Sequence, residues 1–387
     1  MVTISCSAKL HAFALAEQME KNNQLDVFFT SYASPKNTMA KRLVNRIDRE
    51  RIPPEKIFTL FPLAVLTKIF PARAHTWNDI FDKWVAAKLD KSKSGVFIGW
   101  SGMSLYSMRV ARGKGIKTIL ERGSSHIVYQ NNILKEEYKR FGIDFAIHPA
   151  VIEKELQEYR EADYISVPSY FVKDSFISQG IPVGKLLINP YGASSFFTPA
   201  PKTAEQKSSK FRIVYLGTLS FRKGLIYFFE ALGLLSLSEN LYEVWFIGNI
   251  AAEIKPIIEK YKRDNWIFMG KIDHYELGTY LSQCDLGVQP SIEEGLSMVI
   301  LQLMSCAVPV IATTNTGGAN IIQDNVSGCI VPVRSPAAIA EKIEQLFYHT
   351  DQLSAMKKAA ASKIQNGFTW NDYGDRYINT LRKIIHG

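Results

Sequence analysis

The chain has 387 residues, 47% of them hydrophobic, and a net charge of +9 at pH 7. This length exceeds the roughly 250–300 residues at which a single hydrophobic core stops growing, so two domains are expected. No segment approaches the ~20 consecutive apolar residues of a membrane-spanning helix, and the first ten residues lack the pattern of a signal peptide. These features predict a cytoplasmic globular protein and exclude one anchored by apolar spanning helices.

The positive charge is concentrated in the first half of the chain. Residues 1–200 hold 27 Lys and Arg against 19 Asp and Glu, so eight of the nine excess charges lie there. The densest basic cluster spans Lys36–Arg51, where Leu43 and Ile47 recur at helical spacing. A solvated surface helix and peripheral contact with the inner face of an anionic membrane, or with a lipid-linked acceptor, are both compatible with this pattern. A nucleic-acid partner is not expected, because no reader motif accompanies the charge.

Strands and helices alternate in the N-terminal half. Short β-branched and aromatic runs predict the strands, and apolar positions at helical spacing predict helices between them. The segment TPAPKTAEQKSS at 198–209 lacks large apolar residues and predicts a linker. The expected strands are 2–7, 26–30, 95–100, 118–121, 164–168 and 186–190, with helices at 133–141 and 171–179.

The C-terminal half shows the same alternation more clearly, as six strand–helix units in a row. The expected strands are 211–217, 242–248, 266–270, 285–291, 309–314 and 328–333. The expected helices are 224–235, 251–262, 275–284, 296–306, 318–324 and 336–348. The whole chain therefore predicts an α/β protein of two doubly wound Rossmann-like domains facing across a cleft. The expected boundaries are 1–197 for the acceptor-side domain, 198–210 for the linker, 211–365 for the donor-side domain and 366–387 for a last helix.

Two adjacent cations follow the first strand of the C-terminal domain. In the turn Gly217–Gly224 (GTLSFRKG), Arg222 and Lys223 stand just before a predicted helix. Glycine permits close backbone approach, and cations beside a helix N-terminus neutralise phosphate oxygens. An ordinary solvated basic turn is the alternative interpretation.

A second turn, PSIEEGLSM at 290–298, also runs into a helix. Free backbone N–H groups at the start of that helix favour an anion, and the helix dipole adds to the effect. Glu294 is placed to accept hydrogen bonds from sugar hydroxyls, with helix capping as the alternative role. The residues expected to meet the donor phosphates through their N–H groups are Gly295, Leu296, Ser297 and Met298.

Gln302 follows Glu294 by eight residues. If the helix begins near Gly295, Gln302 lies two turns along it, roughly 10 Å away on a similar face. This separation suits one group at a hexose and another at a ribose. The pair Gly317–Gly318, after the next strand, is expected where a side chain would crowd a nucleotide.

These motifs together resemble the donor-site signature of the family 4 retaining glycosyltransferases, which have the GT-B fold. The resemblance rests mainly on Pro290–Gly318 and on the turn Gly217–Gly224, and it covers the chain from about residue 160 to the end. The further matching segments are Glu161–Ser169, Asn189–Gly192 and Phe368–Trp370.

The resemblance implies that Lys223 binds the donor diphosphate and that Glu294 contacts the sugar hydroxyls. Position 302 would contact the ribose, and the last helix would cross back to the N-terminal domain. The nucleotide-diphosphate sugar would be a substrate, and no cofactor is implied. The acceptor would be a glycan, a lipid-linked sugar or a small molecule.

Two positions depart from the family pattern. Gln302 stands where the family usually has Glu, so the hydrogen bond to the ribose loses its charge assistance. Thr218 stands where the family usually has Arg, which removes one phosphate cation. Arg222 is our candidate for the compensating charge.

The N-terminal domain offers four further candidates. His126 follows a predicted strand end, is expected to face the cleft, and resembles the family's N-domain histidine near the reacting sugar. Its role is expected to be catalytic, together with Glu294 and Lys223. Arg122 is a candidate for an acidic acceptor or the leaving phosphate, and Lys9 and His11 are further candidates in the first strand-to-helix loop.

No Asp-x-Asp motif occurs, and the four cysteines lack metal-ligand spacing, so no metal is expected. Fixed charges and helix dipoles would instead stabilise the leaving diphosphate. The resemblance implies retention at the anomeric carbon, and the absence of a clear nucleophile favours a front-face route. A nucleotide-sugar-binding pseudoenzyme and a GT-B nucleotide-sugar epimerase are the alternatives.

Overall fold

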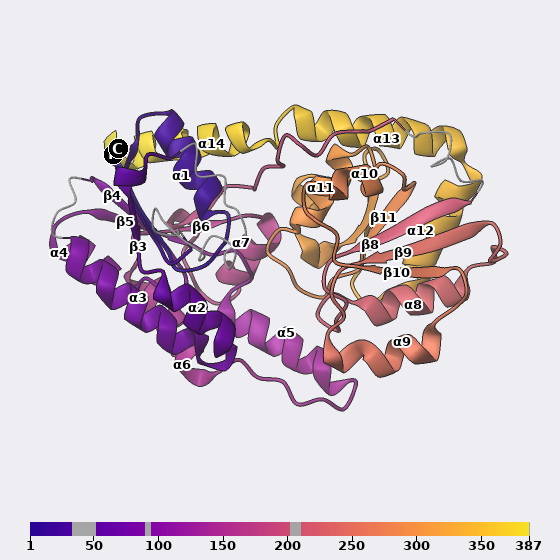
Figure 1. Ribbon diagram of the computed structural model, residues 1–387, viewed down its shortest axis with the longest axis horizontal. Helices are drawn as coiled ribbons and strands as arrows, with labels where there is room; N and C mark the ends of the chain where they lie inside the picture. The colour runs from indigo at the N-terminus through magenta and orange to yellow at the C-terminus, as the bar shows by residue number, and fades with distance from the viewer. Residues whose placement is uncertain (33–51, 90–93, 202–209, 387) are drawn as a thin grey trace.

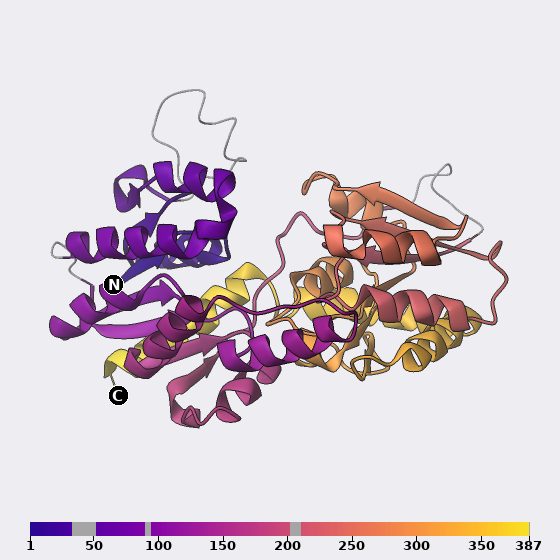
Figure 2. The same cartoon turned by 90° about the horizontal axis from the view of Figure 1, so that it is seen from below.

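The computed structural model describes residues 1–32, 52–89, 94–201 and 210–386. The chain forms two α/β domains that lie side by side (Figure 1). Seen from below, the domains are distinct lobes connected by few segments (Figure 2). The whole basic cluster Lys36–Arg51 and most of the expected linker lie outside the described residues.

The N-terminal domain is built on a parallel seven-stranded sheet with the order β3-β2-β1-β4-β5-β6-β7. All six strands expected in this half are confirmed, and β3 is an additional short strand at one edge. The strands are β1 (Val2–Cys6), β2 (Leu25–Thr30), β3 (Ile57–Thr59), β4 (Val96–Trp100), β5 (Lys117–Glu121), β6 (Tyr164–Val167) and β7 (Leu186–Ile188).

Helices connect these strands and cover the sheet. Side chains that alternate along β4 enter different cores: Ile98 lies in one buried cluster and Phe97 in another. The strand is therefore buried on both faces, as a doubly wound sheet requires. The helices are α1 (Ala12–Lys21), α2 (Pro62–Ile69), α3 (Ala74–Lys88), α4 (Leu105–Gly113), α5 (Ile127–Lys139), α6 (Pro149–Glu161) and α7 (Tyr170–Ile177).

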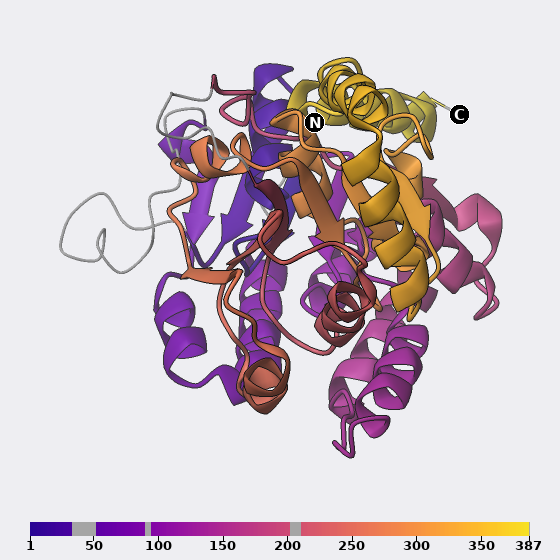
Figure 3. The same ribbon diagram turned by 90° about the vertical axis from the view of Figure 1, so that its right-hand side faces the viewer.

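The C-terminal domain has a parallel six-stranded sheet with the order β10-β9-β8-β11-β12-β13. All six strands expected here are confirmed, and Figure 3 shows helices on both sides of this sheet. The strands are β8 (Phe211–Leu216), β9 (Tyr242–Ile247), β10 (Trp266–Gly270), β11 (Leu286–Gln289), β12 (Val310–Thr313) and β13 (Cys329–Val331). The helices are α8 (Leu225–Leu234), α9 (Lys255–Tyr261), α10 (Leu277–Leu281), α11 (Met298–Ser305), α12 (Pro336–Tyr348) and α13 (Thr350–Gln365).

One expected helix is wrong. The segment 318–324 forms only a short 3-10 turn, Gly318–Asn320. Gly318 at the start of the segment, with Gly317 just before it, disfavours a helix, because glycine pays the largest backbone entropy cost on ordering. Gly317 moreover has a left-handed φ of 70°, which continues no right-handed helix.

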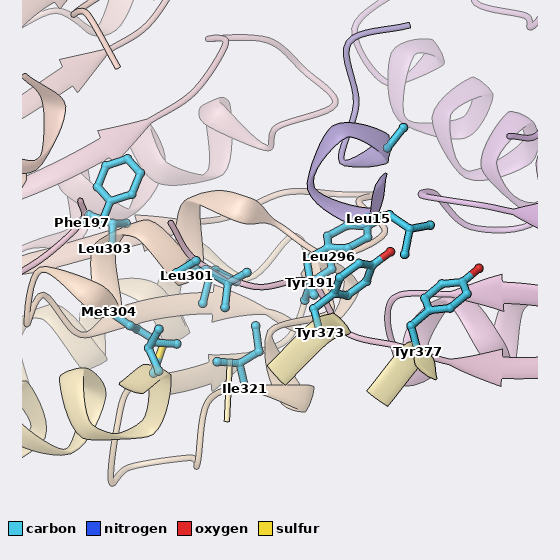
Figure 4. Close-up of a cluster of buried hydrophobic side chains, with 14 of the residues drawn as sticks. Leu15, Tyr191, Phe197, Leu296, Leu301, Leu303, Met304, Ile321, Tyr373 and Tyr377 are labelled. Carbon is cyan, nitrogen blue, oxygen red and sulfur yellow. The ribbon is translucent and has the colours of Figure 1, made fainter. Parts of the chain in front are cut away.

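The last helix, α14 (Trp370–His386), runs from the C-terminal domain across to α1 (Figure 1). Lys21 Nζ donates to Asn371 Oδ1 at 3.0 Å, and Tyr377 donates to Glu121 Oε1 at 2.7 Å. Leu15, Leu296 and Tyr373, from three different segments, belong to one buried cluster that spans both domains (Figure 4). The junction between the domains is thus a continuous apolar core.

Candidate functional site

The site lies where the turns after β8 and β11 pack on each other. The two strands are neighbours in the sheet, so their carboxyl ends meet at one edge. Gly224 has a left-handed φ of 66°, and a Cβ there would collide with the carbonyl oxygen of Pro290. The N–H of Ile292 donates to the carbonyl of Arg222 at 2.9 Å. Glycine at position 224 therefore permits the close contact between the two turns.

This contact pairs the two cations of one turn with the two carboxylates of the other. Lys223 forms an ion pair with Glu294, and Ser291 Oγ donates to the same carboxylate at 2.8 Å. Arg222 pairs with Glu293 at 2.9 Å. Lys223 and Glu294 are both partly accessible, with side chains 25% and 11% exposed. The sequence thus correctly predicted two charged turns, and the structure brings them into direct contact.

Glu293 is fully buried and reaches the other domain. Its Oε1 accepts from Ser125 N at 3.0 Å and from Ser125 Oγ at 2.7 Å, and its Oε2 accepts from Gln130 Nε2 at 3.0 Å. Burial raises the pKa of Glu293, but Arg222, Ser125 and Gln130 outweigh it and hold the pKa below its ordinary value. The bridge that Glu293 makes between the domains was not predicted from the sequence.

The helix after the second turn begins later than expected. Helix α11 starts at Met298, so Gln302 lies only about 6 Å along its axis from the first helical residue. The start is delayed because the N–H of Ser297 donates to Thr316 O at 2.9 Å and that of Glu294 donates to Asn315 O at 3.0 Å. The expectation that the helix begins near Gly295, with Ser297 N–H free for a phosphate, is therefore corrected.

The residues around the start of α11 differ in accessibility. Leu296 is buried in the interdomain core, whereas Met298 and Gln302 are half-buried. Ser297 is 1% exposed, and its Oγ has no hydrogen-bond partner within the described ranges. A buried hydroxyl without a partner is costly, so the Oγ of Ser297 retains an unused donor.

Gly295 is in direct contact with the N-terminal domain. A Cβ at this position would collide with the backbone carbonyl of Gly123, and Ser169 Oγ donates to Gly295 O at 2.6 Å. Gly317 lies on the other side of the same peptide, because its Cβ would meet Gly295 O and Leu296. The pair Gly317–Gly318 therefore serves loop packing, and the expectation that it leaves room for a nucleotide stays a prediction.

The first turn contains a glycine of a different kind. Gly217 has φ 127°, and a Cβ there would meet no atom within 4 Å. The adjacent Thr218 is exposed, and its carbonyl accepts from Tyr215 at 2.8 Å. The space above Gly217 is thus open, at the strand end where the sequence predicts the diphosphate.

His126 does not face the cleft, which corrects a central expectation. The residue is 2% exposed, and its ring packs on Tyr159 and Phe176 with centroids 5.0 and 4.9 Å away. Its Nδ1 accepts from Val128 N at 3.3 Å, which makes it the N-cap of α5. Burial, followed by the charge of Arg122, lowers the pKa of His126 to about 4.

Arg122 is not available to an acidic acceptor, which is a second correction. Its side chain pairs with Glu155 at 2.8 Å and donates to Gln130 Oε1 at 2.8 Å. The residue is 8% exposed. Burial lowers the pKa of Arg122, but Glu155 and neighbouring groups outweigh it and raise the pKa above its ordinary value. Arg122 therefore supports the Gln130 side chain that holds Glu293.

The loop after β1 carries the two remaining candidates. His11 Nε2 lies 3.1 Å from Glu121 Oε2, and its ring packs on Tyr191 at 4.3 Å. Lys9 is exposed, and burial together with Lys271 and Lys68 lowers its pKa. Lys9 lines a cavity of about 990 Å³ that both domains form. The structure thus places Lys9 at the interdomain space and His11 in the junction behind it.

Two further observations concern metals and membranes. Within residues 1–32, 52–89, 94–201 and 210–386, no group of three or more His, Cys, Asp or Glu side chains is arranged to hold a metal ion. The helices of these same ranges include none that is both long and apolar enough to cross a membrane.

Comparison with solved structures defines the fold. Sucrose-phosphate synthase from Thermosynechococcus elongatus superposes with a TM-score of 0.74 at 15% identity, covering 100% of this chain and 99% of that one. HepE of Anabaena, solved with UDP-glucose, gives a TM-score of 0.70 at 14% identity and covers 99% of each chain. Two Rossmann-like domains in this arrangement constitute the GT-B fold, as the sequence predicted.

Comparison with known sequences shows which proteins the C-terminal domain resembles. Residues 210–349 match the family described as Glycosyl transferases group 1. The provisionally named colanic acid biosynthesis glycosyltransferase WcaL of Escherichia coli is 24% identical over 225 residues, 55% of this chain and 54% of that protein. The alpha-D-kanosaminyltransferase of Streptomyces kanamyceticus is 26% identical over 177 residues, 44% of this chain and 45% of that protein. The C-terminal domain therefore resembles the group 1 glycosyl transferases, and the matches span about half the length of these relatives.

Proposed function

We propose that the chain is a glycosyltransferase that moves a sugar from a nucleoside-diphosphate carrier to a hydroxylated acceptor. The observation that carries the proposal is the pairing of Lys223 with Glu294 at the carboxyl ends of β8 and β11. The pair lies inside the segment that matches the group 1 family, at the edge of the sheet where ligands of doubly wound proteins bind. HepE, which has the same fold, binds UDP-glucose.

In the proposed reaction, the central task is to stabilise the diphosphate as the glycosidic bond breaks. Lys223 supplies a cation, the open space above Gly217 admits the phosphates, and the Oγ of Ser297 donates a hydrogen bond. Glu294 accepts hydrogen bonds from the sugar hydroxyls. Preorganised charges of this kind stabilise a leaving group without reorganisation at the moment of reaction, which is our basis for proposing metal-independent transfer.

We infer retention at the anomeric carbon from the resemblance to family 4. A front-face route fits the site, because neither glutamate of the turn is free to act as a nucleophile. Glu293 is bonded to Ser125 and Arg222, and Glu294 is paired with Lys223. In this route the leaving phosphate oxygen accepts the proton of the acceptor hydroxyl. The acceptor side is the N-terminal domain.

A glycan acceptor is supported by the relatives. WcaL is named for colanic acid biosynthesis, and AmsK of Erwinia amylovora for amylovoran biosynthesis. Peripheral membrane contact and a lipid-linked acceptor remain proposals drawn from the basic segment Lys36–Arg51.

The test is a donor screen in the presence of EDTA. A panel of nucleoside-diphosphate sugars is offered to the full chain, and thermal stabilisation and nucleotide release are recorded. The proposal expects one nucleotide class to stabilise the protein and to be slowly hydrolysed. If a donor stabilises the protein but no nucleotide is released, even with acceptors present, the result favours the pseudoenzyme alternative, for which the departures at Gln302 and Thr218 are the evidence. If no donor stabilises the protein, the proposed donor site is rejected.

A further inference from the structure

A second cavity lies wholly within the N-terminal domain. It measures about 450 Å³ and is lined by residues of α3, α4 and α6 and of the loop after β4. This volume is within the range of small-molecule sites, roughly 300–1,000 Å³. Its polar lining includes Asp79, Ser101, Tyr106, Glu153 and Glu155.

The cavity lies beside the edge of the sheet that meets the donor turn, because Ser101 and Gly102, directly after β4, line it. Strands β4 and β5 pair in parallel with Trp100 opposite Glu121, and Ser101 N donates to Glu121 O at 3.0 Å. The loop after β5 carries Ser125, which is bonded to Glu293 of the C-terminal domain. The loops after β4 and β5 therefore lie at one edge, and that edge faces the donor side.

A buried hydrogen-bonded chain connects the cavity to the donor turn. Glu155 lines the cavity, although it is only 5% exposed, and pairs with Arg122 at 2.8 Å. Arg122 donates to Gln130 Oε1 at 2.8 Å, and Gln130 Nε2 donates to Glu293 Oε2 at 3.0 Å. The wall of the cavity is thus fixed relative to the turn that carries Glu294.

The charges of the lining favour some ligands over others. The lysine of the lining, Lys154, forms ion pairs with two carboxylates: its Nζ lies 2.6 Å from Asp79 Oδ1 and 3.1 Å from Asp82 Oδ2. The other titratable base of the wall is His75, whose ring stacks on His148 with centroids 4.7 Å apart. Three carboxylates, those of Asp79, Glu153 and Glu155, line the same space.

Carboxylates accept hydrogen bonds from hydroxyl and ammonium groups and repel other anions. The side chain of Asp79 is 41% exposed, and Glu153 is exposed, so both retain accepting capacity toward a ligand. The basic composition of the first half of the chain suggested an anionic ligand, whereas this lining disfavours one. The nearby cation Arg122 is paired with Glu155.

We propose that this cavity binds the acceptor's sugar unit and selects neutral and amino sugars against acidic ones. The proposal rests on the proposed glycosyl transfer, since it names the acceptor class for that reaction. Binding of a sugar to this cavity requires neither donor nor turnover, so the two ideas fail separately.

The experiment measures binding of three methyl β-glycosides to the full chain by saturation-transfer NMR titration. The probes are the glucoside, the glucosaminide and the glucuronide, which share one ring and differ in charge. We expect the glucosaminide to bind about tenfold more tightly than the glucuronide, with the glucoside between them.

Two variants locate the binding. Glu153→Gln changes an exposed side chain, and Asp79→Asn removes the second accessible carboxylate; each is expected to reduce the preference to within about threefold. Glu259→Gln, at an exposed position of α9 in the other domain, is the matched control and leaves the preference unchanged. Equal or tighter binding of the glucuronide, no binding of any probe, or a preference that persists in both variants would overturn the proposal, even if donor turnover is intact.

Discussion

The carboxylate of Glu293, in the C-terminal domain, accepts two hydrogen bonds from Ser125 of the N-terminal domain, from its backbone N–H at 3.0 Å and its hydroxyl at 2.7 Å. Within the described residues, the next residue, Glu294, makes no such bridge and pairs with Lys223. Two adjacent glutamates of one turn thus have different tasks. Glu293 joins the domains, and Glu294 is the residue that we propose contacts the donor.

This difference predicts opposite effects of two matched substitutions. Glu293→Ala leaves Ser125, Gln130 and Arg222 without their acceptor and is expected to lower the free energy of unfolding by about 1–3 kcal/mol. Glu294→Ala removes a more accessible pair and is expected to cost about 1 kcal/mol or less, but to abolish most donor binding. Urea unfolding and donor titration of both variants check this, and equal stability losses would contradict the division of roles.

A double-mutant cycle tests whether Arg222 acts through Glu293. If Arg222 acts through its 2.9 Å ion pair with Glu293, Arg222→Ala lowers the free energy of unfolding less when Glu293 is already alanine. We expect the loss in that background to be about 1 kcal/mol smaller than the loss in the parent chain. Our earlier hypothesis that Arg222 replaces a missing phosphate cation predicts a different result. In that case Arg222→Ala would weaken nucleotide affinity in both backgrounds.

Gly295→Ala is expected to separate donor binding from transfer. A methyl group at this position would collide with the carbonyl of Gly123 and hold the domains apart. Transfer is expected to fall by about 100-fold, because misplacement of the reacting groups by 1 Å has effects of that size. Nucleotide affinity should change by about twofold or less. The control is Gly233→Ala in α8, where the nearest atom is 3.6 Å from the new Cβ; a similar loss there would contradict the explanation.

Gln302→Glu is expected to tighten donor binding. A carboxylate accepts a charge-assisted hydrogen bond from a ribose hydroxyl, which is roughly twice as strong as the bond to an amide. The KM for the donor should fall several-fold while kcat changes little. Gln179→Glu, exposed in the other domain, adds the same charge as a control. An unchanged or higher donor KM would show that residue 302 does not contact the ribose.

His126 predicts a loss of stability in acid. Its pKa is about 4 in the folded chain against 6.5 for the free group, so the unfolded state binds the proton more readily between these values. The free energy of unfolding should therefore decrease as the pH falls from about 6.5 to about 4, by up to roughly 3 kcal/mol. His126→Asn keeps an N-cap acceptor and should flatten this dependence. Urea unfolding at a series of pH values decides the matter, and an identical slope in the variant would contradict the assignment.

The strands were predictable from sequence because of their burial. Those of the C-terminal domain are largely apolar, and each was found where expected. The short edge strand Ile57–Thr59 was missed, because a strand of only three residues is too short to show a periodic pattern of apolar residues. The charged turns at Arg222 and Glu293 followed from the same strand ends.

The orientation of individual side chains was not predictable. The sequence places His126 five residues after a strand, but the direction of its ring depends on Tyr159 and Phe176, which come from distant elements. Arg122 looked available because its partner Glu155 lies 33 residues away. The late start of α11 likewise depends on Asn315 and Thr316, which accept from the turn across the sheet edge. Each of these outcomes was decided by tertiary contacts.

The central claim is that Lys223 and Glu294 form the donor site, and calorimetric titration of the full chain with the donor identified by the screen tests it most directly. The titration is performed in EDTA on the parent chain, Lys223→Ala, Glu294→Ala and the control Lys260→Ala, which removes an exposed lysine of α9. We expect the first two variants to bind at least about tenfold more weakly, a loss of roughly 1.4 kcal/mol, and the control to bind like the parent chain. Unchanged affinity in both Lys223→Ala and Glu294→Ala would contradict the assignment of the site.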